Sequence, residues 1–207
     1  MADLFFIYGA MGSGKTTELL MKAFDYESEG KKVLLIKPSK DDKGEDKVVN
    51  RMGMERKVDY LVKPEESILS IVTSLNVLPD VIIAEEAQFF TEKQVDELFL
   101  ISKDFDIEVF AYGIRSDFKQ NAFTGSARLF TIADNIVELD KKICNCGAKA
   151  TNNLRLFKGI PVFDGESILI DKASDPSKTE ETDYSYKSVC GNCYLRIRRK
   201  YSGYKKH

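Results

Sequence analysis

Residues 9–16 carry the clearest chemical pattern in the chain. Two glycines separated by four residues are followed by lysine and threonine, which matches the phosphate-loop pattern G-x-x-x-x-G-K-[ST] in full. Glycines let successive backbone N–H groups turn toward an anion, and the start of the following helix adds partial positive charge. We therefore expect a nucleoside triphosphate with Mg²⁺ here, with the lysine at the β- and γ-phosphates and the threonine hydroxyl on the metal. The phosphate loop comprises Gly9, Ala10, Met11, Gly12, Ser13, Gly14, Lys15 and Thr16.

Two adjacent acids follow the apolar run VIIA at residues 81–84. Glu85 lies where a phosphate-loop protein needs a metal-binding acid at a strand end, and Glu86 follows it directly. Adjacent residues leaving a strand point in different directions, so one carboxylate can face Mg²⁺ while the other faces a neighbouring pocket. There Glu86 is suited to accept a proton from an attacking hydroxyl as a phosphoryl group moves. Gln88 and Phe89 add an amide and an aromatic face just beyond the acids.

Four cysteines form two close pairs, Cys144-x-Cys146 and Cys190-x-x-Cys193. Four thiolates in two such pairs suit tetrahedral structural Zn²⁺ with no open position for catalysis. Free or disulfide-linked cysteines are the alternative. The single histidine is His207, which excludes histidine-based catalysis and leaves a carboxylate, lysine, tyrosine or cysteine as the proton acceptor.

The composition excludes several classes of protein. The chain has 207 residues, of which 43% are hydrophobic and 31% are charged, as in globular proteins. A net charge of −2 gives no general argument for nucleic-acid binding. No apolar run approaches the roughly 18 residues of a membrane span, and the first residues lead straight into a predicted strand. We therefore expect a cytoplasmic protein with neither a membrane nor a nucleic acid as partner, whose cysteines serve metal or redox chemistry.

The elements that position these residues alternate between strands and helices up to residue 140. Four of the five apolar runs are nearly continuous, as expected for strands buried on both faces. This alternation predicts an α/β fold: a mainly parallel, RecA-like P-loop sheet with helices on both faces. The predicted strands are 4–8, 33–37, 81–84, 108–112 and 135–139. Four helices are predicted. The first runs from Lys15 and stops at Gly30, and the second starts at Pro64. The third follows a capping box of Thr91 and Gln94, and the fourth covers 125–133.

The pattern changes after residue 140. An Asp164-Gly165 turn between two apolar runs predicts a β-hairpin, and a long polar loop follows it. The basic C-terminal stretch is more typical of a solvated tail than of a phosphate-backbone site. We predict a nucleotide-binding domain over 1–140, a small β-rich zinc-binding domain over 141–195 and a basic C-terminal tail over 196–207.

Several stretches stand in the order and spacing of thymidine kinases of the type II family, and the chain resembles that family over most of its length. These stretches are GAMGSGKTTELL, KPSKDD, IIAEEAQFF, AYGIRSDFKQNAFTGS, the two cysteine pairs and YKSVCGNCY. The resemblance implies a P-loop kinase domain with a zinc-bearing lasso domain, usually assembled as a homotetramer, with a dimer as the alternative. It also implies that ATP phosphorylates thymidine to dTMP, in pyrimidine salvage for DNA synthesis, and that dTTP inhibits the reaction.

The resemblance further implies roles for single residues. Glu86 is similar in position to the catalytic base and Glu85 to the magnesium acid, with Thr16 as a second magnesium ligand. Gln88 joins the phosphate loop in ATP binding, and backbone groups around 168–171 bind the base edge. The implied nucleoside contacts are Phe89, Phe118, Phe123, Ile170 and Tyr186, and the implied zinc ligands are Cys144, Cys146, Cys190 and Cys193.

Three departures from the family pattern stand out. Glu85 replaces an expected aspartate, and Lys43 stands where many relatives carry arginine. The stretch 171–186 is longer than usual, and the expected Gly-Gly pair is missing near it.

The main alternative is a RecA-like ATPase that moves nucleic acid. It would hydrolyse ATP when stimulated by DNA or RNA and would interleave aromatic with basic residues on an exposed surface. The aromatic residues instead cluster after Glu86 and around 118–123, which fits a small pocket better. A zinc-stabilised scaffold would not need Glu86 beside Glu85, and we find no arginine-rich lid of the kind that a nucleotide-monophosphate kinase uses for its acceptor phosphate.

Overall fold

A computed structural model of the chain describes residues 1–39, 46–167 and 183–201. These residues cluster into two compact units. The sheet unit comprises Met1–Tyr8, Gly14–Arg115 and Phe123–Glu138. The cysteine unit comprises Gly9–Ser13, Ser116–Ala122 and the described residues from Leu139 on. Residues Gly9–Ser13 of the phosphate loop therefore belong to the cysteine unit, and the loop residues from Gly14 on belong to the sheet unit.

Six parallel strands form the main sheet of the sheet unit, in the order β5-β2-β6-β7-β1-β8. The predicted parallel α/β fold is confirmed, as are the five predicted strands. The additional edge strand β5 (Tyr60–Val62) is too short to give a pattern. Because the strands run in parallel, the carboxyl ends of β1 and β6 lie at the same edge of the sheet. The other bounds are β1 (Leu4–Tyr8), β2 (Val33–Pro38), β6 (Val81–Ala84), β7 (Glu108–Gly113) and β8 (Asn135–Glu138).

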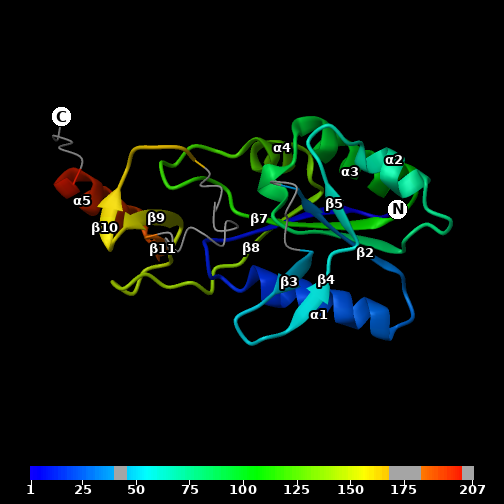
Figure 1. Ribbon diagram of the computed structural model, residues 1–207, viewed down its shortest axis with the longest axis horizontal. Coiled ribbons are helices and arrows are strands. Elements are labelled where there is room, and N and C mark those ends of the chain that lie inside the picture. The colour runs from blue at the N-terminus through cyan, green and yellow to red at the C-terminus, as the bar shows by residue number, and fades with distance from the viewer. Residues whose placement is uncertain (40–45, 168–182, 202–207) are drawn as a thin grey trace, which may run out of the picture. The chain divides into compact units, whose positions relative to one another are not determined.

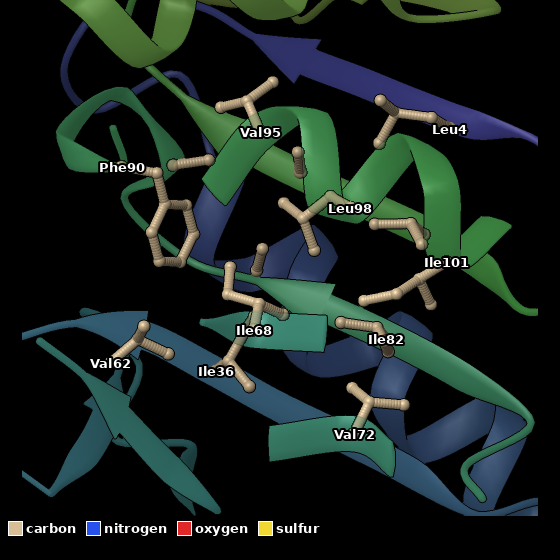
Figure 2. Close-up of a cluster of buried hydrophobic side chains, with 14 of the residues drawn as sticks. Leu4, Ile36, Val62, Ile68, Val72, Ile82, Phe90, Val95, Leu98 and Ile101 are labelled. Atoms are coloured by element: carbon tan, nitrogen blue, oxygen red, sulfur yellow. The ribbon is translucent and has the colours of Figure 1, made fainter. Parts of the chain in front are cut away.

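Helices cover both faces of this sheet (Figure 1). Helix α1 (Lys15–Ser28) lies on one face, and α2 (Ile68–Thr73), α3 (Glu92–Asp104) and α4 (Thr124–Ile132) lie on the other. The core between the sheet and α2 and α3 is mainly aliphatic and includes Ile82 of β6, Leu98 of α3 and Ile68 of α2 (Figure 2). These side chains are fully buried, as expected on one face of strands that are buried on both faces.

The helix starts follow their capping residues. The predicted capping box is confirmed, because Thr91 Oγ1 accepts from Gln94 N at 3.2 Å and Gln94 Oε1 accepts from Thr91 N at 3.0 Å. The predicted start of the second helix at Pro64 is wrong. Ser67 caps that helix by accepting from Ser70 N at 3.1 Å, and α2 therefore begins at Ile68.

A short antiparallel hairpin of β3 (Lys47–Val49) and β4 (Glu55–Lys57) also belongs to the sheet unit and was not predicted. Asn50 holds its turn, because its Oδ1 accepts from the backbone N–H of Met52 and Met54 at 2.9 and 3.0 Å. Its Nδ2 donates to Thr17 Oγ1 of α1 at 3.3 Å. The hairpin is thus linked to the first turn of the helix that follows the phosphate loop.

The cysteine unit contains a three-stranded antiparallel sheet in the order β10-β9-β11. The second arm of the hairpin predicted around Asp164-Gly165 extends into 168–170, which lie outside the described residues. Strand β10 pairs with the preceding strand β9 through a turn at Lys158-Gly159. Both turn residues have positive φ, 48° and 79°, as the two-residue turns of hairpins require. Helix α5 runs through residues 196–201 of the predicted tail. The bounds are β9 (Asn152–Phe157), β10 (Ile160–Val162), β11 (Tyr184–Val189) and α5 (Gly191–Tyr201).

Candidate active site

The phosphate loop adopts a conformation that its glycines make possible. Gly12 and Gly14 have φ values of 72° and 94°, in the left-handed region that side chains disfavour. A Cβ on Gly9 would lie 2.5 Å from Ser13 Oγ and 2.7 Å from the carbonyl oxygen of Leu139. The first glycine therefore has no room for a side chain. Ser13 N closes the loop by donating to Ala10 O at 3.1 Å.

The middle of the loop is bonded to two strands of the cysteine unit. Met11 N donates to Asn153 Oδ1 of β9 at 2.9 Å, and Met11 O accepts from Ser188 Oγ of β11 at 2.6 Å. Ser188 Oγ also lies 3.3 Å from Asn153 Oδ1, so the two side chains form one small network. Sequence analysis missed both residues, because polar side chains in short strands carry no motif of their own.

Lys15 begins α1 and lies close to the two acids that follow β6. Burial lowers the pKa of its ammonium to about 8, against the opposing effect of the negative charges of Glu86 and, more weakly, Glu85. The charges of both carboxylates therefore act on the lysine. A partly desolvated cation beside two acids, at the start of a helix, is an arrangement suited to bind the phosphates and metal of a nucleotide.

Glu85 is held at the end of β6 by the neighbouring strand β2. Its backbone N–H donates to Ile36 O at 2.9 Å, which continues the parallel ladder by one residue. Its carboxylate lies 3.4 Å from Lys37 Nζ, and both side chains are mostly buried. This carboxylate therefore has a fixed position at the edge of the sheet where phosphate loops bind their ligands.

Glu86 has an unusual backbone conformation. Its φ of 48° and ψ of 39° lie in the left-handed region, which costs a residue with a side chain about 1–3 kcal/mol. The chain turns there into the short 3-10 helix η1 (Ala87–Phe89), and Phe89 N donates to Glu86 O at 3.0 Å. The strained turn makes Glu86 leave the strand in a direction different from that of Glu85.

Gln88 faces the interior of the sheet unit. It is buried, and its Oε1 accepts from Ile114 N at 3.3 Å. A Cβ on Gly113 would lie 2.9 Å from the same Oε1. The contacts of Gln88 are therefore with the end of β7, and they hold the turn that carries Glu86.

Two of the predicted nucleoside contacts lie together in the sheet unit. The rings of Phe89 and Phe123 pack edge to face, with centroids 5.3 Å apart and an interplanar angle of 76°. Both side chains are partly exposed, so they offer aromatic surface beside the turn at Glu86.

Two others meet in the cysteine unit at a residue that sequence analysis missed. The Arg155 guanidinium carbon lies 3.7 Å from the centroid of the Phe118 ring, and Arg155 Nε donates to Tyr186 Oη at 3.0 Å. An arginine between two leucines in a strand normally points to solvent, so the sequence gives no signal for this role. Ile170 lies outside the described residues, and so do Lys43 and the predicted base-edge segment 168–171.

The four cysteines form a compact cluster in the cysteine unit. Their sulfur atoms lie within 4.8 Å of one another, and Cys146 Sγ is 3.5 Å from Cys190 Sγ. Four sulfurs held tetrahedrally at about 2.3 Å from zinc lie about 3.8 Å apart, so the cluster fits such an ion. Hydrogen bonds from the backbone N–H groups of Cys146 and Cys190 lower the pKa of the Cys144 thiol to about 6, which favours the thiolate that a metal requires. The other ligand candidate is Cys193, on the first turn of α5.

None of the described helices is both long and apolar enough to cross a membrane. The aligned solved structure of Bacteroides Pif1 bound to ssDNA has a TM-score of 0.36 and 16% identity, over 66% of this chain and 38% of that chain. A similarity this low has no bearing on function.

Comparison with known proteins gives a far stronger match to one family. The thymidine kinase family description matches residues 2–194. The thymidine kinase of Coxiella burnetii is 40% identical over 172 residues, which cover 81% of this chain and 87% of that protein. The thymidine kinase of Lactobacillus johnsonii is 38% identical over 199 residues, which cover 92% of this chain and 94% of that protein. The family match over 2–194 includes the phosphate loop, the acids after β6 and the cysteine pairs, and the chain therefore belongs to the thymidine kinase family.

Proposed function

We propose that this protein transfers the γ-phosphoryl group of ATP to the 5′-hydroxyl of thymidine, giving ADP and dTMP. The strongest support in the structure is that Lys15, at the start of α1, and the acids Glu85 and Glu86, which follow β6, lie at the same edge of the parallel sheet. One cation and two separately directed carboxylates provide a phosphate contact, a metal ligand and a base, which together make up the groups that phosphoryl transfer needs.

Glu86 acts as the general base in this proposal. Its carboxylate accepts the proton of the thymidine 5′-hydroxyl as the O5′–phosphorus bond forms. The bond between the γ-phosphorus and the β–γ bridging oxygen breaks, and ADP leaves with the electron pair. The left-handed turn that aims Glu86 away from Glu85 supports two distinct roles for the two acids. Lys15 stabilises the negative charge that shifts onto the phosphate oxygens.

Thr16 and Glu85 are the residues that we assign to Mg²⁺. A hydroxyl and a carboxylate are the oxygen ligands that this ion prefers, and the ion neutralises phosphate charge when bound. Lys37, 3.4 Å from Glu85, keeps the longer glutamate side chain in place where relatives are expected to carry aspartate. We assign Gly9 to Thr16 and Gln88 to ATP binding; Gln88 also accepts from Ile114 N and so supports the turn that carries Glu86.

We assign the thymidine site to the aromatic residues Phe89, Phe118, Phe123 and Tyr186, with Ile170 as a further contact. The packing of Phe89 on Phe123, and of Phe118 and Tyr186 on one arginine, supports two preformed aromatic surfaces. Aromatic faces recognise a pyrimidine by stacking, and backbone groups then distinguish its edge.

Structural Zn²⁺ is our assignment for the four-cysteine cluster, on the basis of the sulfur positions. We also propose feedback inhibition by dTTP. This nucleotide joins the nucleoside of the product to a triphosphate, so one molecule carries groups for both the nucleoside site and the phosphate loop. A homotetramer, or a dimer, is the proposed assembly, and sedimentation of the purified protein tests it.

A nucleoside panel tests the proposed function directly. Purified protein is incubated with ATP, Mg²⁺ and thymidine, deoxyuridine, deoxycytidine or deoxyadenosine, and the phosphorylated product is identified by mass spectrometry. We expect dTMP from thymidine and inhibition when dTTP is added. ATP hydrolysis that needs DNA or RNA and gives no nucleotide product would instead support the nucleic-acid motor.

A further inference from the structure

The charge of Arg155 is the least expected feature of the cysteine unit. Its side chain is 1% exposed, although it sits in the middle of β9. Among the residues that the structure describes, no carboxylate lies within 4.0 Å of its guanidinium. Burying a charge without an anionic partner is costly, and an apolar side chain of similar volume would normally give a more stable core. The guanidinium therefore needs a reason beyond packing.

The contacts of Arg155 use the whole plane of the guanidinium. Its face lies on the Phe118 ring at 3.7 Å. At the edge of the plane, Nε donates to Tyr186 Oη at 3.0 Å and Nη2 donates to Ser167 O at 3.0 Å. A planar fork stacked on a ring fixes the ring orientation and both acceptors at once, which a lysine or an apolar side chain cannot do.

The pairing of β9 with β11 brings Arg155 and Tyr186 together. Arg155 of β9 lies directly opposite Tyr186 of β11. Leu154 and Leu156 pack into the cysteine core, so Arg155 projects from the other face of the strand. Asn153 is on that same face, and its side chain bonds the phosphate loop at Met11.

A second set of bonds holds the partner segment of Phe118. Asp117 is buried, and its Oδ2 accepts from Ser167 Oγ at 2.6 Å, while Arg155 binds the carbonyl of the same serine. Lys119 Nζ donates to Gly165 O at 2.8 Å, and Tyr194 Oη donates to Phe118 O at 2.6 Å. The Tyr194 and Lys119 hydrogen bonds hold the backbone around Phe118 without Arg155. What Arg155 adds is the orientation of the Phe118 ring and of the Tyr186 hydroxyl.

We propose that Arg155 is a positioning residue for the nucleoside: its guanidinium orients Phe118 and Tyr186 and thereby sets the affinity for thymidine. The proposal rests on the assignment of these two aromatic residues to the thymidine site. Arg155 acts on nucleoside binding alone, since its contacts do not include the phosphate loop, Lys15 or the acids after β6.

Steady-state kinetics of Arg155→Met and Arg155→Lys test the proposal, with Arg128→Met as the matched control. Arg128 is an arginine of the sheet unit whose Nε binds Asp96 at 2.6 Å, and its loss removes the same charge elsewhere. We expect Arg155→Met to raise KM for thymidine by roughly tenfold or more, as for a loss of about 1.4 kcal/mol of binding. KM for ATP should stay within about twofold of the wild-type value, a change equivalent to about 0.4 kcal/mol. Arg155→Lys should not restore the KM for thymidine, because lysine keeps the positive charge but lacks the planar guanidinium.

Tyr186→Phe provides a second measurement that does not depend on the folding of an Arg155 variant. It keeps the ring and removes the hydroxyl that accepts from Arg155. We expect a smaller rise in KM for thymidine, and no added rise when it is combined with Arg155→Met, because the two residues act as a pair. Zinc content and thermal unfolding of each variant report whether the cysteine unit is intact.

Three outcomes would overturn the proposal, besides the absence of any effect of Arg155→Met on KM for thymidine. They are equal increases in both KM values, full recovery with Arg155→Lys, and additive effects of Arg155→Met and Tyr186→Phe. The assignment of the thymidine site fails separately, if Phe118→Ala and Tyr186→Ala leave KM for thymidine unchanged. If those two variants raise it while Arg155→Met does not, only the role of Arg155 is wrong.

Discussion

A Cβ on Gly125 would lie 2.4 Å from the carbonyl oxygen of Ala87, a distance that no packed side chain tolerates. Gly125 opens helix α4, and Ala87 directly follows Glu86 in the left-handed turn. The carbonyl oxygens of Phe90 and Gln88 lie 2.8 and 3.0 Å from the same position. The start of α4 is therefore packed against the backbone that aims Glu86.

Gly125→Ala should displace this turn, because its new methyl group meets backbone rather than a flexible side chain. We expect a loss of about 1–3 kcal/mol in stability, as for overpacked cores. We also expect kcat to fall by roughly tenfold or more, or at least about 1.4 kcal/mol of barrier. Thermal unfolding and steady-state kinetics measure the two effects. Thr124→Ala, at the exposed neighbouring position, is the control, and a Gly125→Ala enzyme with normal kcat would show that the turn tolerates the shift.

Lys15→Ala should abolish turnover, because the loop then lacks the point charge on the β- and γ-phosphates. Initial rates of dTMP formation at saturating substrates provide the measurement. Lys22→Ala, two turns further along α1, removes a lysine that lies 4.3 Å from the Phe110 ring and should retain activity. If Lys15→Ala kept more than about a tenth of the wild-type kcat, which is about 1.4 kcal/mol of barrier, the loop would have another role.

Glu86→Gln should separate binding from chemistry. The amide preserves shape but cannot take the proton of the 5′-hydroxyl, so we expect kcat to drop by roughly 10² or more with little change in the affinity for ATP or thymidine. Single-turnover kinetics and equilibrium binding give the two quantities. Glu92→Gln, at the exposed start of α3, is the matched control. Loss of affinity with normal kcat would make Glu86 a binding residue and return Glu85 to consideration as the base.

Ser188→Ala should weaken ATP binding through the phosphate loop. It removes the 2.6 Å hydrogen bond to Met11 O and leaves that carbonyl without its side-chain donor. A net loss of about 0.5–1.5 kcal/mol corresponds to a rise of roughly two- to twelvefold in KM for ATP. Ser185→Ala, at an exposed position of the same strand, should have no effect. A selective change in KM for thymidine would contradict this role.

Cys190→Ser should release the metal and loosen the cysteine unit. Zinc binding in small thiolate sites is worth about 10–16 kcal/mol near neutral pH, enough to decide whether such a unit folds. We expect less than one zinc per chain by elemental analysis, faster proteolysis of residues 165–190, and a larger rise in KM for thymidine than for ATP. Freshly purified wild-type protein that was active but contained no zinc would contradict this role of the metal. Equal increases in KM for both substrates would contradict it too.

Local patterns determined the parts of this protein that lie close together in the chain. The phosphate loop, the acid pair after β6, the capping box at Thr91 and the paired cysteines each need only a few consecutive residues. Apolar runs likewise identified the five main strands, because a strand buried on both faces must be apolar along its length. The thymidine kinase resemblance rested on the same local stretches.

Pairing between distant segments decided the rest. No local pattern singled out Arg155, and only the tertiary structure places it opposite Tyr186 and against the Phe118 ring. The turn at Lys158-Gly159 was not predicted for the same reason, since it follows from the pairing of β10 with β9. The left-handed turn at Glu86 is packed against Gly125, a residue 39 positions further along the chain. When a remote segment buries or orients a side chain, the neighbouring residues in the sequence carry no pattern that predicts it. Only tertiary packing then determines the role of that side chain.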